Sequence, residues 1–490
     1  KRRERAGYAV IAFLFTLAMI IGKAQGAEED LKYSLIAVIL FAGYMPLFYV
    51  IISFLGGKIT DMADGQGECR TSSRVTRWLF EDHVVLGVML VVFLCRLPYL
   101  IAFYPCSMSW DGGAQICDFY SLHDSGAFFN HHPPLVSFLY GAAALYSQKW
   151  GIPDLGMFVI PLMQTCLSAF AVAQVCVLYR ELAIPYWIRW TSLAYYGLFT
   201  VWCMFDVTYI KDSIYWPLTL LYTVEMVWCL VRQEAFFAGR KHVLLMILYG
   251  VLMTQTRNNG IFVLLFTIPV LFVIMQGKRK GYCLGAAAAI FAAVYLLDNA
   301  LYPALGVVNL EVKEDTYCLL FQQTAKYGQD HPDDVTEEER AFLNRMFDYD
   351  ELVEAYNPQL ADWVKNCLKI CEATSADGTN SEFAQIRDEY FRVWFAQFLR
   401  HPLSYVNTFL ECSYGYYYPE VRPYKEGTGF YEMDRNMFTE GMHPARQITA
   451  LEPFRFLLEQ VSKFEYLPGI GLLYRCGFYT WCVAFAAGWL

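Results

Sequence analysis

Long apolar stretches separated by short polar segments make up most of the chain. Ten of them approach the about 20 residues that a membrane-spanning helix needs, at 8–21, 33–54, 84–104, 156–179, 187–205, 214–230, 243–253 (extending to about 256), 261–275, 284–302 and 470–489. A further apolar segment, 135–146, is too short to span a bilayer and follows two prolines, so we expect a helix that lies in the membrane surface. The pattern predicts an all-α polytopic membrane protein with about ten or more spans and interfacial helices.

Composition leads to the same class. The 490 residues are 56% hydrophobic and only 17% charged, with a mean hydropathy of +0.30. A single water-soluble core does not absorb so much apolar sequence at this length, whereas a bilayer does. The formal net charge of −9 argues against a nucleic-acid partner, for which a basic face is expected.

Basic residues orient the bundle, because short cytoplasmic loops carry an excess of Lys and Arg. We place the amino terminus in the cytoplasm and keep 135–146 interfacial. Lys278, Arg279 and Lys280 then lie inside, while the segment 105–132, which holds no Lys or Arg, lies outside. If 135–146 spanned the bilayer, every later loop would change sides and the rule would fail. We therefore expect a multi-pass protein of the cell membrane.

The predicted spans divide the chain into three parts. Residues 1–302 form a transmembrane bundle, with an external catalytic loop and the interfacial helix at about 105–150. Residues 303–467 form a large external insert, with helical patterning around 341–346 and 382–398. Residues 468–490 add one more span. The chain begins without Met and stops within an apolar run, so we expect further helices beyond it. Cys106 and Cys117 lie in the external loop and either pair or stay reduced.

Four polar clusters fall at the outer ends of predicted helices, where ionisable groups usually mark a function. They are Trp110, Asp111, Gln115 and Asp118; Asn130, His131 and His132; Asp206, Lys211 and Asp212; and Arg257, Asn258 and Asn259. If they converge on one face, they supply a carboxylate base, cations and candidate metal ligands.

Each cluster also has a structural interpretation. Asp111 precedes two glycines and is either a catalytic base or a structural residue, in a turn or at a helix cap. His131 and His132 are loop residues or site residues, and Lys211 and Asp212 form a site or a local ion pair. Arg257 either binds a phosphate through its planar fork or reaches the lipid head groups. Arg96 is a weaker case of the same kind.

The order of these clusters resembles the GT-C class of membrane glycosyltransferases, which includes the protein O-mannosyltransferases, the aminoarabinose transferases of lipid A and uncharacterised bacterial relatives. Asp111 matches the acid of the external loop, and the sequence His132-Pro133-Pro134-Leu135 matches the interfacial motif. Lys211-Asp212 and Arg257-Asn258-Asn259-Gly260 are similar to the later polar loops. The likeness covers roughly residues 84–302. Two additional spans precede the Asp111 loop, and Gly112 replaces the second acid of the mannosyltransferases.

The resemblance implies an inverting transfer of a sugar from a polyprenyl-phosphate donor to an external hydroxyl of a glycan, lipid or protein. Asp111 is then the general base, and Arg257, Lys211 and Asn258 bind the donor phosphate. His131, His132, Asp212, Asp118, Trp110 and Gln115 are further candidates for the site. The resemblance leaves open whether the site holds a divalent metal, Mg or Mn. Its candidate ligands are Asp111, Asp212 and His132. The absence of an Asn-x-Ser/Thr sequon suits a bacterial chain.

The main alternative is a polytopic transporter or lipid flippase for a glycan or a lipid-linked precursor. Polar residues in the middle of broken helices would favour that alternative. The clusters here lie at one face instead, which favours the transferase.

Overall fold

The computed structural model describes residues 2–26, 34–64, 73–369, 375–421 and 448–489. Parts of the predicted external insert, 370–374 and 422–447, lie outside the described residues. The chain divides into two compact units. One contains Lys1–Gln66, Leu310–Thr428 and Lys463–Leu490, and the other contains Gly67–Asn309 and Gly429–Ser462. Each unit is described by itself.

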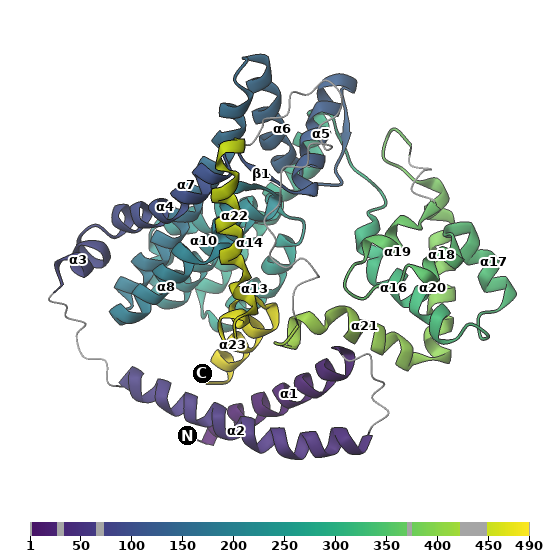
Figure 1. Cartoon of the computed structure of the whole chain (residues 1–490), viewed down its shortest axis with the longest axis horizontal. Helices are drawn as coiled ribbons and strands as arrows, with labels where there is room; N and C mark the ends of the chain where they lie inside the picture. Colours follow the sequence, from purple (N-terminus) through teal and green to yellow (C-terminus); the bar gives the residue numbers. More distant parts are fainter. Residues whose placement is uncertain (1, 27–33, 65–72, 370–374, 422–447, 490) are drawn as a thin grey trace. The chain divides into compact units, whose positions relative to one another are not determined.

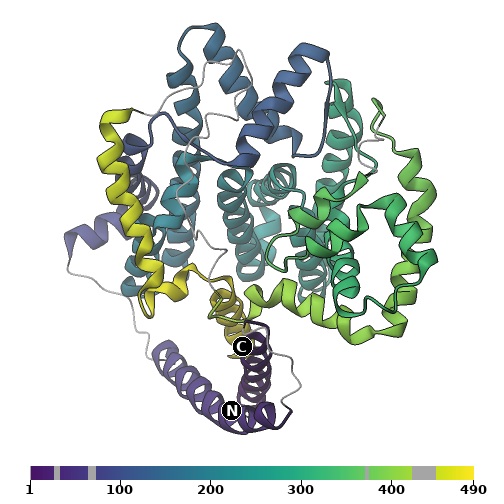
Figure 2. The same ribbon diagram turned by 45° about the vertical axis from the view of Figure 1, so that its right-hand side comes forward.

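The second unit is a helical bundle (Figures 1 and 2). All four polar clusters belong to it. Its elements are α3 (Arg74–Arg77), η1 (Trp78–Asp82), α4 (Val84–Ala102), β1 (Ser107–Met108), α5 (Trp110–Ser125), β2 (Phe128–Phe129), α6 (Pro134–Lys149), α7 (Pro153–Glu181), α8 (Tyr186–Leu198), α9 (Thr200–Val207), β3 (Thr208–Tyr209), α10 (Lys211–Arg232), α11 (Glu234–Ala238), α12 (Arg240–Thr256), α13 (Gly260–Ile274), α14 (Lys278–Leu296), η2 (Leu297–Leu301), α15 (Tyr302–Ala304), β4 (Val307–Val308), η6 (Thr449–Leu451) and α22 (Glu452–Ser462).

Helix α4 shows how this bundle separates an inner face from a lipid-like outer face. Val84, Val88 and Val92, spaced four residues apart, are buried against α7. Leu86 and Leu94 on the opposite side are 68% and 53% exposed. A helix that is apolar on both sides is covered on its outer side by lipid rather than by water. The same holds for α13, where Phe266 and Val273 are about three-quarters exposed.

Six helices in the described parts of the chain are long and apolar enough to cross a membrane. They correspond to the first, second, third, fourth, sixth and ninth predicted spans. The seventh, eighth and tenth predicted spans are the shorter helices α12, α13 and α23 (Cys476–Trp489). The coarse prediction of an all-α membrane protein is confirmed, and ten spans are not.

The fifth predicted span, 187–205, is wrong as a single helix. Helix α8 ends at Leu198, Phe199 adopts an extended backbone (φ −68°, ψ 123°), and α9 begins at Thr200. The freed carbonyls of Tyr196 and Gly197 accept hydrogen bonds from the Arg96 guanidinium at 2.6 and 2.5 Å. An internal cation thus satisfies the backbone groups that the break exposes, as a break at membrane depth requires.

The other unit combines the first two helices with most of the predicted insert. Its elements are α1 (Arg2–Gly26), α2 (Ser34–Asp64), η3 (Glu314–Tyr317), α16 (Cys318–Asp330), α17 (Glu337–Met346), α18 (Tyr349–Glu354), α19 (Asp362–Asn366), α20 (Ser381–Arg400), α21 (Pro402–Tyr417), η7 (Lys463–Tyr466), η8 (Ile470–Tyr474) and α23. Helices α1 and α2 pack side by side (Figure 1). The two helical segments predicted within the insert are confirmed by α17 and α20. The predicted three-part division of the chain stays a prediction.

The segment 310–421 has an apolar core of its own. Phe321, Leu343, Phe347 and Tyr390 are fully buried and belong to one cluster. A capping box between Thr336 and Glu339 begins α17 and satisfies backbone donors at its first turn. Such a core indicates a folded helical part rather than an extended linker.

Candidate functional site

The site begins with two short strands that lie side by side. Strand β1 pairs parallel with β3, with Ser107 opposite Thr208 and Met108 opposite Tyr209. Each strand leads after one residue into a helix, β1 into α5 and β3 into α10. Two helix starts are therefore placed next to each other. The sequence did not predict this pairing, because two-residue strands carry no periodic signal.

The pairing puts two carboxylates at equivalent positions. Asp111 is the second residue of α5, and Asp212 is the second residue of α10. The partial positive charge of a helix amino terminus stabilises an acidic side chain in the first turn. Asp111 thus lies in the first turn of a helix and not in a turn between elements. Ser109 caps α5 by accepting from the Gly112 N–H at 3.1 Å, so Asp111 is not needed as the cap.

Close backbone approach makes Gly112 necessary at this junction. The Ser109 hydroxyl donates to the Tyr209 carbonyl at 2.8 Å and ties the start of α5 to β3. A Cβ atom on Gly112 would lie 2.0 Å from the same carbonyl oxygen. Only glycine therefore allows α5 to begin this close to the neighbouring strand.

Each carboxylate has a cation beside it. Lys211 Nζ lies 2.5 Å from Asp111 Oδ2 and crosses from the first residue of α10 to α5. Arg257, which follows α12, forms an ion pair with Asp212. The side chains of Asp111 and Lys211 are 35% and 19% exposed, so the pair is reachable from outside the bundle. The structure thus brings together charged residues from three of the four predicted clusters: Asp111 from the first, Lys211 and Asp212 from the third, and Arg257 from the fourth.

The electrostatics of Asp111 have opposing causes. Burial raises the pKa of its carboxyl, but the hydrogen bond and charge of Lys211, with smaller contributions from His132 and His131, hold the pKa below its ordinary value. Because the charges of His132 and His131 act on the Asp111 carboxyl, both histidines lie near it. Their rings contact each other edge to face at 4.8 Å, and His132 is buried. Asp111 is therefore a carboxylate at neutral pH.

The comparisons with known proteins give a family. A family model described as a family of unknown function, DUF6020, matches residues 120–489. The chain belongs to this family. No curated protein matches the chain, and no solved structure does. The matched part of this DUF6020 member includes Lys211, Asp212 and Arg257 and begins after Asp111 and Gln115.

A polar stripe continues from Asp111 along α5 of the DUF6020 chain. Gln115 and Asp118 follow at helical spacing, so the three side chains share one face. Gln115 is fully buried, and neither of its side-chain polar atoms has a hydrogen-bond partner in the part of the chain that the structure describes. Asp118 accepts from the Ser137 hydroxyl of α6 at 3.0 Å. Burial outweighs this hydrogen bond and raises the pKa of Asp118 to about 7.

The remaining candidates are less closely tied to the site. Trp110, the first residue of α5, is 74% exposed. Asn258 lies exposed in the turn between α12 and α13, and its side chain makes no hydrogen bond within the described residues. Cys106 and Cys117 are recorded as thiols rather than as a disulfide, and burial raises the pKa of both.

The metal ligands suggested by the sequence do not assemble here. Among the residues that the structure describes, no three His, Cys, Asp or Glu side chains lie close enough together to hold a metal ion. Asp111 and Asp212 each face a cation instead. This arrangement does not fit a divalent metal.

Asp206 and Arg96 belong to the scaffold of the site. The two side chains form an ion pair of 2.7 Å and are both fully buried. Asp206 also accepts from Ser168 at 2.6 Å. Because neither group is accessible, this pair holds the α8–α9 break and the approach to β3. Neither alternative considered for Arg96, a phosphate contact or a reach to the lipid head groups, describes this buried side chain.

Sequence reasoning missed two residues that position β3. Gln164 of α7 donates to the carbonyls of Asp206 and Thr208 at 3.0 Å, and the Tyr140 hydroxyl donates to the Ile210 carbonyl at 2.8 Å. Both side chains are fully buried. Gln164 stands within the apolar run 156–179, and a buried amide inside a predicted span is a signal that could have identified it. Tyr140 gives no comparable signal.

Proposed function

We propose that this chain is a membrane glycosyltransferase that transfers a sugar from a polyprenyl-phosphate donor to an acceptor hydroxyl. The observation that supports the proposal best is the accessible ion pair of Asp111 with Lys211, placed beside Asp212 and Arg257 by the paired strands. A carboxylate next to two cations provides what an inverting displacement requires: one base and one site for a leaving phosphate.

The proposed reaction is a single displacement. The acceptor oxygen attacks the anomeric carbon of the sugar, and the proton of the acceptor hydroxyl passes to Asp111. The bond between the anomeric carbon and the phosphate oxygen breaks, and its electron pair leaves with the polyprenyl phosphate. Arg257 and Lys211 offset the negative charge of that phosphate. No nucleophilic carboxylate is needed, because the configuration inverts in one step.

Lys211 connects the two halves of this reaction. In the described state it contacts Asp111 and holds the pKa of the carboxyl low, which makes Asp111 a weak base. A donor phosphate competes with Asp111 for the Lys211 ammonium. When Lys211 moves toward the phosphate, burial dominates and Asp111 becomes more basic. Donor binding thus increases the basicity of Asp111, whereas Asp111 stays a weak base as long as the site is empty.

The lipid part of the donor fits the surroundings. Trp110 is exposed at the start of α5, and the outer faces of α4 and α13 are apolar. Aromatic side chains at the ends of spans favour the head-group level of a membrane. We place the site on the external face, with the amino terminus in the cytoplasm, as the distribution of basic residues favours.

The test uses the purified full chain in detergent with a panel of labelled polyprenyl-phosphate sugars. Asp111→Asn removes the base. Asp124→Asn near the other end of α5 is the matched control, because Asp124 is 75% exposed and, among the described residues, pairs only with its neighbour His123. We expect donor consumption to fall at least about 100-fold in the first variant and to stay unchanged in the control. Donor binding should persist in both.

One observation favours the transporter alternative. The break between α8 and α9, with a buried ion pair beside it, resembles the discontinuous helices of transporters. Uptake of a lipid-linked sugar into liposomes without donor consumption, and equal behaviour of the unaltered chain and Asp111→Asn, would support it and contradict the transferase.

A further inference from the structure

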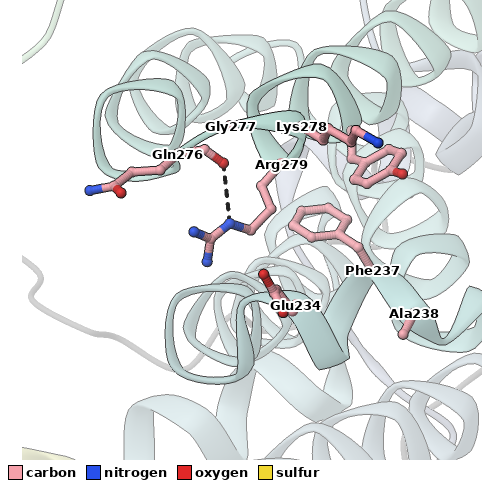
Figure 3. Close-up of a pocket in the computed structure, with 8 residues that line it drawn as sticks. Glu234, Phe237, Ala238, Gln276, Gly277, Lys278 and Arg279 are labelled. Carbon is pink, nitrogen blue, oxygen red and sulfur yellow. Dashed lines mark hydrogen bonds between the residues drawn. The ribbon is translucent and has the colours of Figure 1, made fainter.

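A second region of the bundle has the form of a binding site and lies away from Asp111. A hollow of about 580 Å³ opens between α11 and the start of α14 (Figure 3). Lys278, Arg279, Gln276 and Glu234 contribute its polar side, and Phe237 and Tyr282 contribute aromatic rings. None of these residues takes part in the proposed transfer.

A second hollow of about 360 Å³ adjoins the first, because Phe237 and Tyr282 line both. It lies between α12 and α14, which pack against each other. Apart from Arg240 at its mouth, its lining is apolar or glycine: Val243, Leu244, Ile247, Gly281, Gly285 and Ala286. From Arg240 to Ile247 the groove follows two turns of α12, about 10 Å.

Two glycines keep this groove open. A Cβ atom built on Gly281 or on Gly285 meets no other atom within 4 Å. Neither glycine is therefore required for close packing of the protein against itself. Both instead leave room on the face of α14 that lines the groove, where a ligand chain can lie.

The charges at the mouth are unequal. Arg240, Lys278 and Arg279 face a single acidic side chain, Glu234. Arg279 donates to the Gln276 carbonyl at 3.2 Å (Figure 3). It also donates to the Gln233 side chain, so both partners are neutral. The Lys278 side chain makes no hydrogen bond or ion pair within the described residues and stands exposed. The mouth therefore carries uncompensated positive charge beside an apolar groove.

We propose that this double hollow binds an anionic glycerophospholipid, with its phosphate at Lys278, Arg279 and Arg240 and one acyl chain in the groove between α12 and α14. The occupant follows from the pairing of a cationic mouth with an apolar groove at the start of an apolar, span-length helix, where lipid head groups lie. The basic residues stand where the sequence predicts the cytoplasmic side.

This inference does not rest on the proposed transferase activity. Arg240 begins α12 and Arg257 follows its end, so the two sites are separated by the length of that helix, about 25 Å. Failure of one proposal leaves the other intact. The two sites would lie at opposite faces of the membrane.

The experiment measures lipid binding to the full chain by native mass spectrometry from detergent. The probe is phosphatidylglycerol, phosphatidylcholine is the zwitterionic comparison, and glycerol 3-phosphate is the soluble competitor. We expect phosphatidylglycerol to bind at least about fivefold more tightly than phosphatidylcholine. Glycerol 3-phosphate should not displace it, because it lacks the chain that fills the groove.

Two matched pairs of variants locate the site. Lys278→Gln should weaken phosphatidylglycerol binding about fivefold, whereas Lys280→Gln, whose ammonium lies over the Phe272 ring outside the hollow, should change it less than twofold. Gly285→Leu fills the groove and should weaken binding by a similar factor. Gly43→Leu on α2, where a Cβ atom also meets nothing, is its control.

Three results would overturn the proposal. Equal affinity for the two lipids would remove the role of the cationic mouth, and displacement by glycerol 3-phosphate would identify a site for free phosphates instead. Equal effects of Lys278→Gln and Lys280→Gln would place the lipid elsewhere on the basic surface. Elution as a single peak in gel filtration confirms that each variant is folded, and Lys278→Gln decides the question if Gly285→Leu does not fold.

Discussion

Two carboxylate–cation pairs involve residues that flank β3 in the sequence, and they differ in their exposure to solvent. Asp206 and Arg96 are fully buried, and Arg96 also binds two backbone carbonyls at the α8–α9 break. Asp111 and Lys211 are partly exposed and form an ion pair with each other. The same chemical groups therefore serve the fold in one place and are available to a ligand in the other.

Solvent access explains the difference. Breaking a buried pair leaves an uncompensated charge in a medium of low polarity, so such a pair exchanges partners only at high cost. A partly exposed pair contributes little to stability, and a phosphate can replace one of its members. Sequence alone did not distinguish the two pairs, because Arg96 and Lys211 both lie near predicted outer helix ends, Arg96 within an apolar run and Lys211 between two of them.

The largest expected effect comes from breaking the buried pair. Arg96→Met leaves Asp206 and the carbonyls of Tyr196 and Gly197 without their donor, and we expect a loss of about 3–5 kcal/mol in the free energy of unfolding. Thermal unfolding in detergent measures it. Arg77→Met is the control, since Arg77 is 70% exposed in its pair with Asp82 and should cost less than about 1 kcal/mol. Similar losses in both variants would contradict a special role for Arg96.

The second effect concerns activity rather than stability. Lys211→Gln should lower donor turnover about 100-fold, because a cation at the leaving phosphate is lost. It should also move the acid limb of the pH profile of kcat/KM to higher pH, since Lys211 holds the pKa of Asp111 low and burial raises it. A slower variant with an unmoved acid limb would show that Lys211 does not control the base.

A smaller effect is expected where the two helix starts meet. Gly112→Ala brings a Cβ atom into the Tyr209 carbonyl and should cost about 1–3 kcal/mol by forcing β1 and β3 apart. Because both carboxylates depend on this register, KM for the donor should rise as well. Gly43→Ala, with no atom near its Cβ, should not destabilise the chain. Equal unfolding temperatures for the two variants would argue against close approach at Gly112.

The fold was largely predictable because apolar length is a strong signal. The spans that became α4, α7, α10 and α14 follow from hydropathy alone. The break at Phe199 was missed because its cause, the contact of Arg96 with two carbonyls, joins residues about a hundred positions apart. Asp111, Lys211 and Arg257 were correctly selected as polar residues at helix ends. Which cation faces which carboxylate depends on the β1–β3 register, and no local pattern encodes it.

The smallest effect separates Asp118 from both pairs. This carboxyl has a hydroxyl neighbour, Ser137, and no cation within the described residues forms an ion pair with it. Its pKa of about 7 in the fold lies above the ordinary value of 3.8, so the folded chain binds a proton that the unfolded chain releases between these values. Stability therefore decreases as pH rises from about 4 through 7.

Asp118→Asn should stabilise the chain by about 1–2 kcal/mol at pH 8 and leave it nearly unchanged at pH 4, once solvent near this half-buried group is allowed for. Thermal unfolding at the two pH values measures the difference, and Asp124→Asn, fully outside the stripe, controls for the loss of one negative charge. If Asp118→Asn destabilised the chain at pH 8, the ionised carboxylate would have a stabilising partner. Asp118 would then belong to the charged site around Asp111.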